Sequence, residues 1–243
     1  MPALTATEAQ LLERVRSARE RRAILPGGGV SELTLEGAYR VQEALGAGRV
    51  LRGHKLGLLS EAKQRQMGIR EPIYGRVYAD MLLGPAESLR RFLQPRLEPE
   101  LAVILRSDVP PGTVPSKARA AFSGYFLAVD VLDSVWQDYR FTAPEVVADN
   151  ASGGGFALGP VLIPETDLPT QLRLFANGTL RSEGPTEALG DLGARVAWLA
   201  DRVGGLRAGQ VVFLGSPAPA VPAEPGIVEV WGAGGVLQFR LEP

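Results

Sequence analysis

The chain has 243 residues, of which 45% are hydrophobic, and a formal net charge of −1 at pH 7. This length can bury a large core in one domain or in two small ones, and the near-zero charge provides no basic field for nucleic acid. With no cysteine and one histidine, His54, the chain cannot form disulfides or metal sites of several Cys or His ligands, so oxygen ligands are expected for any bound metal.

The first part of the chain is predicted to open with helices. Thr5 and Glu8 have the spacing of a capping box, and they precede an amphipathic pattern that reaches about Arg22. Thr34 and Ser60 are placed to cap two further helices. In chain order, the predicted elements are helices at 6–22 and 35–45, a strand at 50–58, a helix at 61–67 and a strand at 73–78.

The remainder of the chain is rich in predicted strands. Apolar or alternating runs predict strands at 97–105, 125–132, 155–163, 171–176, 209–214, 227–231 and 236–241, and a helix at 189–203. The sequences at 177–178 and 232–235 are typical of hairpin turns. This order indicates an α+β fold, with a small helical N-terminal part at 1–84 and a β-rich body at 85–243 that together form one functional unit.

Nucleotide and membrane binding have no support in the sequence. Neither GxGxxG nor GxxxxGK[ST] occurs, so no organic cofactor is expected. No apolar run approaches the roughly 20 residues that a transmembrane helix needs. The N-terminal residues also lack a basic stretch followed by an apolar one. We therefore expect a cytoplasmic protein.

The most informative feature is a pair of glutamates, Glu98 and Glu100, at the start of an apolar run. Residues two apart on a strand point to the same side, so the two carboxylates are expected to share one face. Like charges held close together repel each other, and a divalent cation such as Mg²⁺ or Mn²⁺ relieves this repulsion. The alternative is a pair of solvated glutamates on an edge strand.

Four motifs occur in the order and spacing of one family: 53–58 (GHKLGL), 95–102 (PRLEPELA), 132–134 (LDS) and 147–152 (VADNAS). The chain resembles the 2-keto-4-pentenoate hydratase / 4-oxalocrotonate decarboxylase family, within the fumarylacetoacetate hydrolase-like superfamily, from about residue 35 to its end. The resemblance implies a mixed β-roll or barrel-like body, a Mg²⁺ or Mn²⁺ ion and a homo-oligomer. It also makes a complex with a partner hydratase or decarboxylase plausible.

Carried over residue by residue, the resemblance makes Glu98, Glu100 and Asp130 the metal ligands. The family usually has Glu where Asp130 stands, which leaves open whether the shorter Asp ligates directly or through a water. Asp130 lies in an apolar run, where an acid without a partner is costly. The alternatives are a buried, hydrogen-bonded Asp130 and ligation by Asp133, which falls on the opposite face of a regular strand.

Lys55 is the predicted catalytic residue. The resemblance implies that it acts on the substrate as a proton donor or electrostatic partner, whereas the alternative is a side chain that snorkels to the surface. His54, its neighbour on the strand, is expected to point away from the site. The resemblance further implies substrate contacts at Leu58, Asp149, Asn150, Ser152 and Ser216.

The reaction implied by the resemblance belongs to aromatic meta-cleavage catabolism. A metal-dependent lyase would decarboxylate 2-oxo-3-hexenedioate (4-oxalocrotonate) to 2-hydroxypenta-2,4-dienoate through a metal-bound dienolate. The alternative is a hydratase of 2-hydroxypentadienoate (2-keto-4-pentenoate) or of 2-oxohept-3-enedioate. An acylpyruvate-type C–C hydrolase and a non-catalytic binding module are less favoured.

Two positions bear on the choice between decarboxylase and hydratase. Hydratases of the family often have an acid where this chain has Ile73, and isoleucine cannot handle a proton, which favours the decarboxylase. Decarboxylases often have a basic residue near Gly155, where this chain offers none. The candidates to bind a second substrate carboxylate are Arg65, Arg70, Arg76 and Arg140.

Overall fold

The computed structural model describes residues 3–29, 33–232 and 234–243. The helices are α1 (Ala6–Arg21), α2 (Leu35–Leu45), α3 (Glu61–Gln66), α4 (Pro115–Ala120), α5 (Ala143–Ala148) and α6 (Leu192–Val203). The strands are β1 (Leu51–Gly57), β2 (Ile73–Tyr78), β3 (Ala86–Ser88), β4 (Arg96–Leu105), β5 (Phe122–Leu132), β6 (Gly153–Leu158), β7 (Gln171–Ala176), β8 (Thr179–Pro185), β9 (Val211–Phe213), β10 (Val221–Pro222), β11 (Gly226–Gly232) and β12 (Gly235–Glu242). The predicted α+β class is confirmed.

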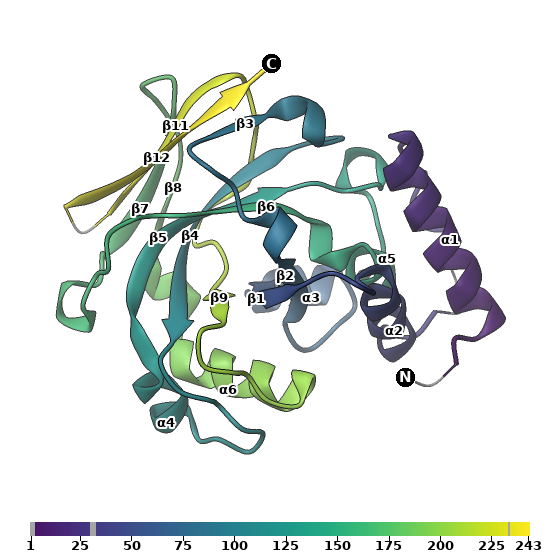
Figure 1. The fold of residues 1–243 in the computed structure, drawn as a ribbon, viewed down its shortest axis with the longest axis horizontal. Helices are drawn as coiled ribbons and strands as arrows, with labels where there is room; N and C mark the ends of the chain where they lie inside the picture. The colour runs from purple at the N-terminus through teal and green to yellow at the C-terminus, as the bar shows by residue number, and fades with distance from the viewer. Residues whose placement is uncertain (1–2, 30–32, 233) are drawn as a thin grey trace.

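The strands form two sheets. The seven-stranded sheet has the order β2-β1-β9-β4-β5-β6, with β10 also paired to β4, and the five-stranded sheet has the order β3-β12-β11-β7-β8. In Figure 1 the five-stranded sheet lies at the upper left, α1, α2 and α5 lie together at the right, and α4 and α6 lie at the bottom. β1 pairs with β2 on one side and with β9 of the C-terminal half on the other, so residues from both predicted parts share one sheet.

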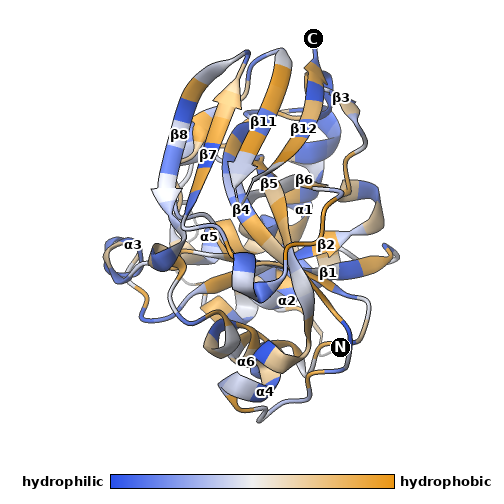
Figure 2. Ribbon diagram, turned by 90° about the vertical axis from the view of Figure 1, so that its left-hand side faces the viewer, coloured by the Kyte–Doolittle hydropathy of each residue, from blue (hydrophilic) through white to orange (hydrophobic). Residues whose placement is uncertain are grey.

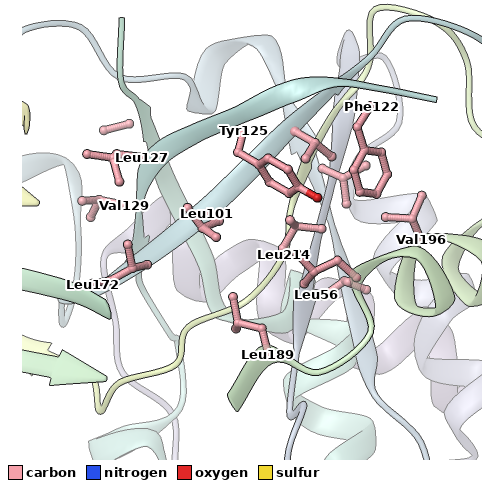
Figure 3. Close-up of a cluster of buried hydrophobic side chains, with 14 of the residues drawn as sticks. Leu56, Leu101, Phe122, Tyr125, Leu127, Val129, Leu172, Leu189, Val196 and Leu214 are labelled. Carbon is pink, nitrogen blue, oxygen red and sulfur yellow. The ribbon is translucent and has the colours of Figure 1, made fainter. Parts of the chain in front are cut away.

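The hydrophobic core lies mainly between the two sheets. β12 alternates buried and exposed side chains along its length, as expected for a strand that covers a core with one face (Figure 2). Leu101 of β4, Val129 of β5 and Leu172 of β7 belong to one buried cluster, which α6 extends through Val196 (Figure 3). β4 and β5 also pair with each other along most of their length, so both strands are held by this core.

The N-terminal helices form a second, smaller core. Thr5 and Glu8 make both hydrogen bonds of the predicted capping box, and α1 buries Leu11, Val15 and Ala18 along one stripe. These side chains pack in a cluster with residues of α2 and α5. The loop at 149–152 directly follows α5, so this small core supports the loop.

Most predicted elements are confirmed, with shifts at their ends. Asn177 and Gly178 both have positive φ values, 52° and 75°, as a two-residue type I′ hairpin turn requires. The turn at 232–235 includes residue 233, which lies outside the described residues, but Gly232 pairs with Gly235 across it. The sequence analysis did not predict β3, β8, β10, α4 and α5, which lack a long apolar period. No helix in the described part of the chain has both the length and the hydropathy of a membrane span.

Candidate metal and substrate site

Three carboxylates meet where β4 and β5 pair. Glu98 and Glu100 point to the same side of β4, and the antiparallel register places Glu98 directly opposite Asp130 of β5. Each of the three contributes a carboxylate oxygen that lies within 4.8 Å of the other two. The alternative of solvated glutamates on an edge strand is wrong, because β4 lies inside the sheet between β9 and β5 and Glu100 is fully buried.

The hydrogen bonding of these carboxylates is incomplete. Glu100 Oε2 accepts a hydrogen bond of 3.0 Å from the backbone N–H of Gly215. Glu100 Oε1 and Asp130 Oδ1 are buried and have no hydrogen-bond partner among the described residues. Each buried oxygen without a partner costs about 1–3 kcal/mol. Three clustered carboxylates, two of which keep an unpaired buried oxygen, are the donor set that hard divalent cations such as Mg²⁺ prefer, so the residues present fit a metal ion.

The electrostatics of the cluster agree with this fit. Burial raises the pKa of the Glu98, Glu100 and Asp130 carboxyls, because the charged form loses its hydration. The pKa of Glu100 rises well above its ordinary value, since repulsion from Asp130 and Glu98 adds to the burial. The group is therefore unfavourable as three bare charges, and a bound cation would restore its charged form.

Lys55 is buried beside the carboxylates. Its Nζ lies 2.8 Å from Asp130 Oδ2 and donates a hydrogen bond of 2.8 Å to the carbonyl oxygen of Ala151. Burial alone lowers the pKa of this ammonium, but attraction to Asp130, Glu98 and Glu100 outweighs burial, and the net pKa is raised. The snorkelling alternative is wrong, because only 3% of Lys55 is exposed.

A strained loop orients Lys55. Asn150, Ala151 and Ser152 all have positive φ values, 52°, 52° and 55°, which residues other than glycine rarely adopt. The Asn150 side chain holds the loop on β2, since its Oδ1 accepts from the N–H of Arg76 and its Nδ2 donates to the carbonyl of Arg76. The loop backbone then presents the Ala151 carbonyl to Lys55.

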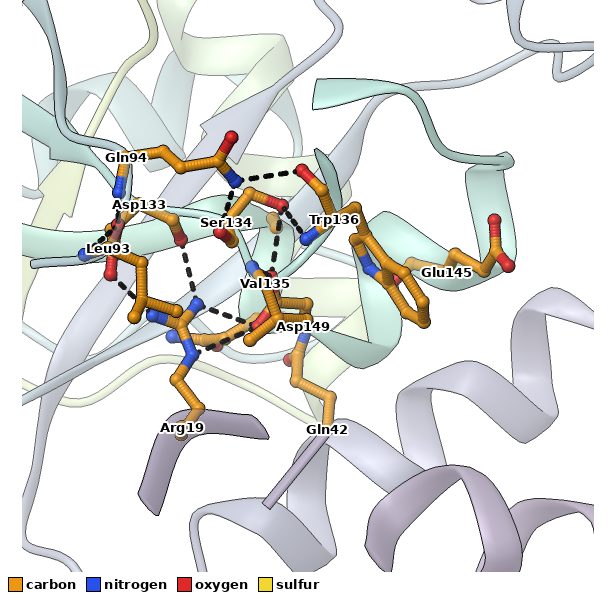
Figure 4. A network of polar contacts seen from close by, with 12 residues as sticks. Arg19, Gln42, Leu93, Gln94, Asp133, Ser134, Val135, Trp136, Glu145 and Asp149 are labelled. Carbon is orange, nitrogen blue, oxygen red and sulfur yellow. Dashed lines mark hydrogen bonds and ion pairs between the residues drawn. The ribbon is translucent and has the colours of Figure 1, made fainter. Parts of the chain in front are cut away.

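A second polar network lies behind this loop (Figure 4). The guanidinium of Arg19 bonds Asp133 Oδ2 at 2.6 Å and Asp149 Oδ1 at 2.7 Å. The remaining oxygens of both aspartates accept from the backbone, at Leu93 and Gln94 for Asp133 and at Val135 for Asp149. Asp133 is therefore not the competing metal ligand, because both oxygens of its carboxylate already accept hydrogen bonds within this network.

A cavity of about 530 Å³ opens beside the carboxylates. Lys55 and Glu98 line it, together with the predicted substrate-binding residues Leu58, Ser152 and Ser216. The Ser152 hydroxyl is buried and has no hydrogen-bond partner among the described residues, so it is available to a ligand.

The other predicted contacts lie behind the cavity wall. Asp149 and Asn150 do not line the cavity, and their observed contacts support the loop. Their role in substrate binding stays a prediction. His54 is also absent from the lining, as predicted: it is buried, and burial lowers its pKa to about 3.

Two basic side chains that were not predicted to reach the cavity line it beside Lys55. Arg65, Arg70, Arg76 and Arg140 do not line it, whereas Arg96 and Lys63 do. The signal for Arg96 was present: it precedes Glu98 by two positions, and so the rule that pairs Glu98 with Glu100 also places Arg96 on their face of β4.

The chain is similar to known proteins in sequence and in fold. The family model "Fumarylacetoacetate (FAA) hydrolase C-terminal" matches residues 59–240. The chain is 32% identical to a 4-oxalocrotonate decarboxylase of Pseudomonas sp, over 84% of this chain and 88% of that protein. It is 34% identical to a 2-keto-4-pentenoate hydratase of Paraburkholderia phymatum, over 76% of each chain.

The fold is also similar to a solved structure of 4-oxalocrotonate decarboxylase from Pseudomonas putida G7, complexed with magnesium and adipate. The two structures superpose with a TM-score of 0.85 at 28% sequence identity, over 98% of this chain and 100% of the other.

Proposed function

The chain belongs to the fumarylacetoacetate hydrolase family, and on this premise we propose that it decarboxylates 2-oxo-3-hexenedioate to 2-hydroxypenta-2,4-dienoate with a divalent metal ion. Its relatives are named decarboxylases and hydratases, so it is an enzyme of this group. The single observation that carries the proposal is the carboxylate cluster with unpaired oxygens beside a buried lysine at the inner end of a cavity.

Glu98, Glu100 and Asp130 are the residues that would hold the ion, with Mg²⁺ or Mn²⁺ as the fitting metals. When bound, the ion supplies Lewis-acid stabilisation of the negative charge that develops on the 2-oxo oxygen of the substrate. Lys55 keeps its proton at neutral pH, because its pKa is raised, and its ammonium is held in place by Asp130 and the Ala151 carbonyl. It can therefore place a proton at the substrate oxygen.

The reaction balances with these groups alone. The C5–C6 bond breaks, the C6 carboxylate leaves as CO₂, and the electron pair moves through C4 and C3 to the 2-oxo oxygen. That oxygen gains one proton, which Lys55 is placed to deliver, and the product is the 2-hydroxy dienoate. The apolar residues of the lining, such as Leu58 and Ile73, keep water away from the reacting atoms.

A specific observation favours decarboxylation over hydration. Ile73 lies in the cavity wall, where it offers no group to activate or deliver water. The decarboxylase with adipate, a six-carbon dicarboxylate, matches this chain over nearly its full length, which supports a dicarboxylate substrate. The second candidate is hydration of 2-hydroxypenta-2,4-dienoate, because the sequence identity to the named hydratase is as high as that to the decarboxylase.

Hydrolysis of a C–C bond has less support. The described lining contains no histidine or aspartate that could activate water, since His54 and Asp149 lie outside it. A homo-oligomer and a complex with a partner hydratase or decarboxylase stay predictions from the family resemblance, and a cytoplasmic location stays a prediction from the sequence.

A paired ultraviolet assay tests the proposal. One cuvette contains 2-oxo-3-hexenedioate and the other 2-hydroxypenta-2,4-dienoate, each with Mg²⁺ and again with excess chelator. We expect only the first substrate to be consumed rapidly, with loss of activity in chelator and recovery on adding Mg²⁺ or Mn²⁺. Rapid turnover of the dienoate without decarboxylation would show that the chain is a hydratase and not a decarboxylase. Activity that the chelator leaves unchanged would refute the metal site.

A further inference from the structure

Arg96 stands on the same face of β4 as the two glutamates. Glu98 and Glu100 are two and four positions further along the strand, and the strand rise of about 3.3 Å per residue places Arg96 roughly 7 Å beyond Glu98. Both Arg96 and Glu98 line the cavity. One strand therefore sets the distance between the carboxylate cluster and a guanidinium inside the same cavity.

Tyr139 holds this guanidinium in place. The Arg96 guanidinium carbon lies 4.3 Å from the centre of the Tyr139 ring, in a cation–π contact. The ring is itself fixed, because the Tyr139 hydroxyl donates a hydrogen bond of 2.8 Å to the Gln94 carbonyl. The stack immobilises one face of the guanidinium and leaves its N–H groups at the edge free to bind a ligand.

No carboxylate of the protein satisfies these N–H groups. Within residues 3–29, 33–232 and 234–243, no acidic side chain forms an ion pair with Arg96, whereas most other arginines that are stacked or buried have one. A half-buried guanidinium that is stacked, fixed and without an acidic partner is suited to bidentate binding of a carboxylate from outside the chain.

The charge balance of the cavity points to the same ligand. With a divalent ion bound, the three carboxylates are balanced by the ion and Lys55, so the inner end has no net formal charge. The Arg96 charge is then in excess. A ligand with one carboxylate at the inner end and a second one near Arg96 would meet a positive group at each end.

We infer that Arg96, stacked on Tyr139, is the receptor for the distal carboxylate of the substrate, so that the site selects 2-oxo dicarboxylates over 2-oxo monocarboxylates. The five carbon–carbon bonds of a six-carbon diacid, about 1.5 Å each, span a length close to the separation of Glu98 and Arg96 along the strand. This inference rests on the proposed function for the identity of the substrate. It explains how the chain can bind a second carboxylate without a basic residue near Gly155.

Lys63 is the other cation of the lining that could compete for this role. It lies exposed on the short helix α3, and no ring or hydrogen bond fixes its ammonium in the described structure. Its entropy cost on binding a carboxylate is therefore larger than that of the stacked Arg96. Lys63→Met is thus the matched control for Arg96→Met, since each variant removes one positive charge from the same cavity.

Binding of two unreactive probes tests the inference. Calorimetric titrations with adipate and with hexanoate, each in saturating Mg²⁺, give the ratio of the two affinities for the wild type, Arg96→Met, Arg96→Lys and Lys63→Met. We expect the wild type to prefer adipate and Arg96→Met to lose that preference by about tenfold to hundredfold, the usual range for a lost charge-assisted pair. Arg96→Lys should retain part of it, and Lys63→Met should retain most of it.

Two outcomes would overturn the inference. One is an unchanged preference for adipate in a folded Arg96→Met protein, and the other is a larger loss in Lys63→Met than in Arg96→Met. Circular dichroism and hexanoate binding check that each variant is folded, and Arg96→Lys provides a second variant if Arg96→Met is not. A wild type that prefers adipate through Arg96 but does not decarboxylate would refute the proposed function and leave this inference standing.

Discussion

Two groups of buried acids lie on either side of the same strand end, and they differ in one respect. Asp133 and Asp149 share Arg19, and every oxygen of their carboxylates accepts at least one hydrogen bond. Lys55 forms an ion pair with Asp130 and is attracted by Glu98 and Glu100, yet Glu100 and Asp130 each keep a buried oxygen without a hydrogen-bond partner in the described structure. Asp130 and Asp133 are three residues apart and fall into different groups.

The difference in hydrogen bonding distinguishes a network that stabilises the fold from a cluster that is suited to bind a ligand. The Arg19 network is complete, so it can stabilise the fold by joining α1 to the strand end and to α5 without any ligand. The Glu98 cluster is incomplete, so it stores an unfavourable free energy that a bound cation relieves. Both groups combine acids with one base and both have more acids than bases, so the sign of the charge does not distinguish them. Counting unsatisfied oxygens does distinguish them.

Removing two ligands of the incomplete cluster should have the largest effect. Glu98→Gln with Glu100→Gln keeps the shape of both side chains but removes the charge that binds the cation. We expect Mg²⁺ affinity, measured by calorimetric titration, to fall by more than about hundredfold, since even outer partners of metal ligands cost tenfold to hundredfold. Glu20→Gln, on the exposed face of α1, is the control, and an unchanged affinity in the double variant would reject the metal site.

Replacing Lys55 should separate chemistry from metal binding. Lys55→Met removes the proton-bearing group but none of the three carboxylates. We expect turnover to fall on the order of 10²–10⁴-fold, the range for loss of a general acid, with a much smaller change in Mg²⁺ affinity. Steady-state kinetics beside a calorimetric titration measure both effects. An unaffected turnover number would show that Lys55 has only a structural role.

Breaking the complete network should affect stability instead of activity. Arg19→Met leaves Asp133 and Asp149 as buried carboxylates without their cation, which costs about 3–5 kcal/mol. Urea denaturation should show this loss, while Mg²⁺ affinity should stay within about threefold of the wild type. Arg16→Met, on the exposed side of the same helix, should change stability by less than about 0.5 kcal/mol. If Arg19→Met lost Mg²⁺ affinity and kept its stability, the Arg19 network would belong to the metal site and not to the support of the fold.

The pH dependence of metal stabilisation is the smallest expected effect. The pKa values of Glu98, Glu100 and Asp130 are raised in the folded, metal-free protein. Their contribution to stability is therefore full below the ordinary carboxyl pKa and is lost as the pH rises through the raised values. Protons also compete with Mg²⁺ for the same oxygens.

The increase in Tm on adding saturating Mg²⁺ should accordingly grow from pH 5 to pH 8, reaching about 5–10 °C. Scanning calorimetry at several pH values measures it, and the double Gln variant should show no such increase. A Tm increase that is larger at pH 5 than at pH 8 would contradict the raised pKa values of this cluster.

Local patterns predicted much of the fold and part of the site. The alternation of side chains along a strand was enough to place Glu98 and Glu100 on one face, and the capping residues were enough to place the start of α1. The same patterns could not find α4 or β10, which are short and are held by contacts with distant residues. The alternation along β5 favoured Asp130 over Asp133, but it could not bring Asp130 to Glu98, because that contact depends on which strand pairs with β4 and in which register.

The substrate contacts show the same limit. The resemblance to the family placed Asp149 and Asn150 at the substrate, but their side chains are used by Arg19 and by the backbone of Arg76. Arg65, Arg70, Arg76 and Arg140 were the predicted partners of a second carboxylate, yet Arg96, which is part of the motif that contains both glutamates, is the arginine that lines the cavity. A linear pattern shows which residues share a face, and it does not show which of them faces a cavity.

The sequence by itself determined the chemistry that this protein can use: oxygen ligands on one strand face and no cysteine, because these follow from residue types and from the two-residue period of a strand. Only the tertiary structure decided which acids are left unsatisfied. The pairing of β4 with β5 places Asp130 opposite Glu98, whereas the packing of α1 places Arg19 in an ion pair with Asp133. Hydrogen-bond satisfaction is a property of neighbours in space, and residues 114 positions apart in the chain become neighbours only when it folds.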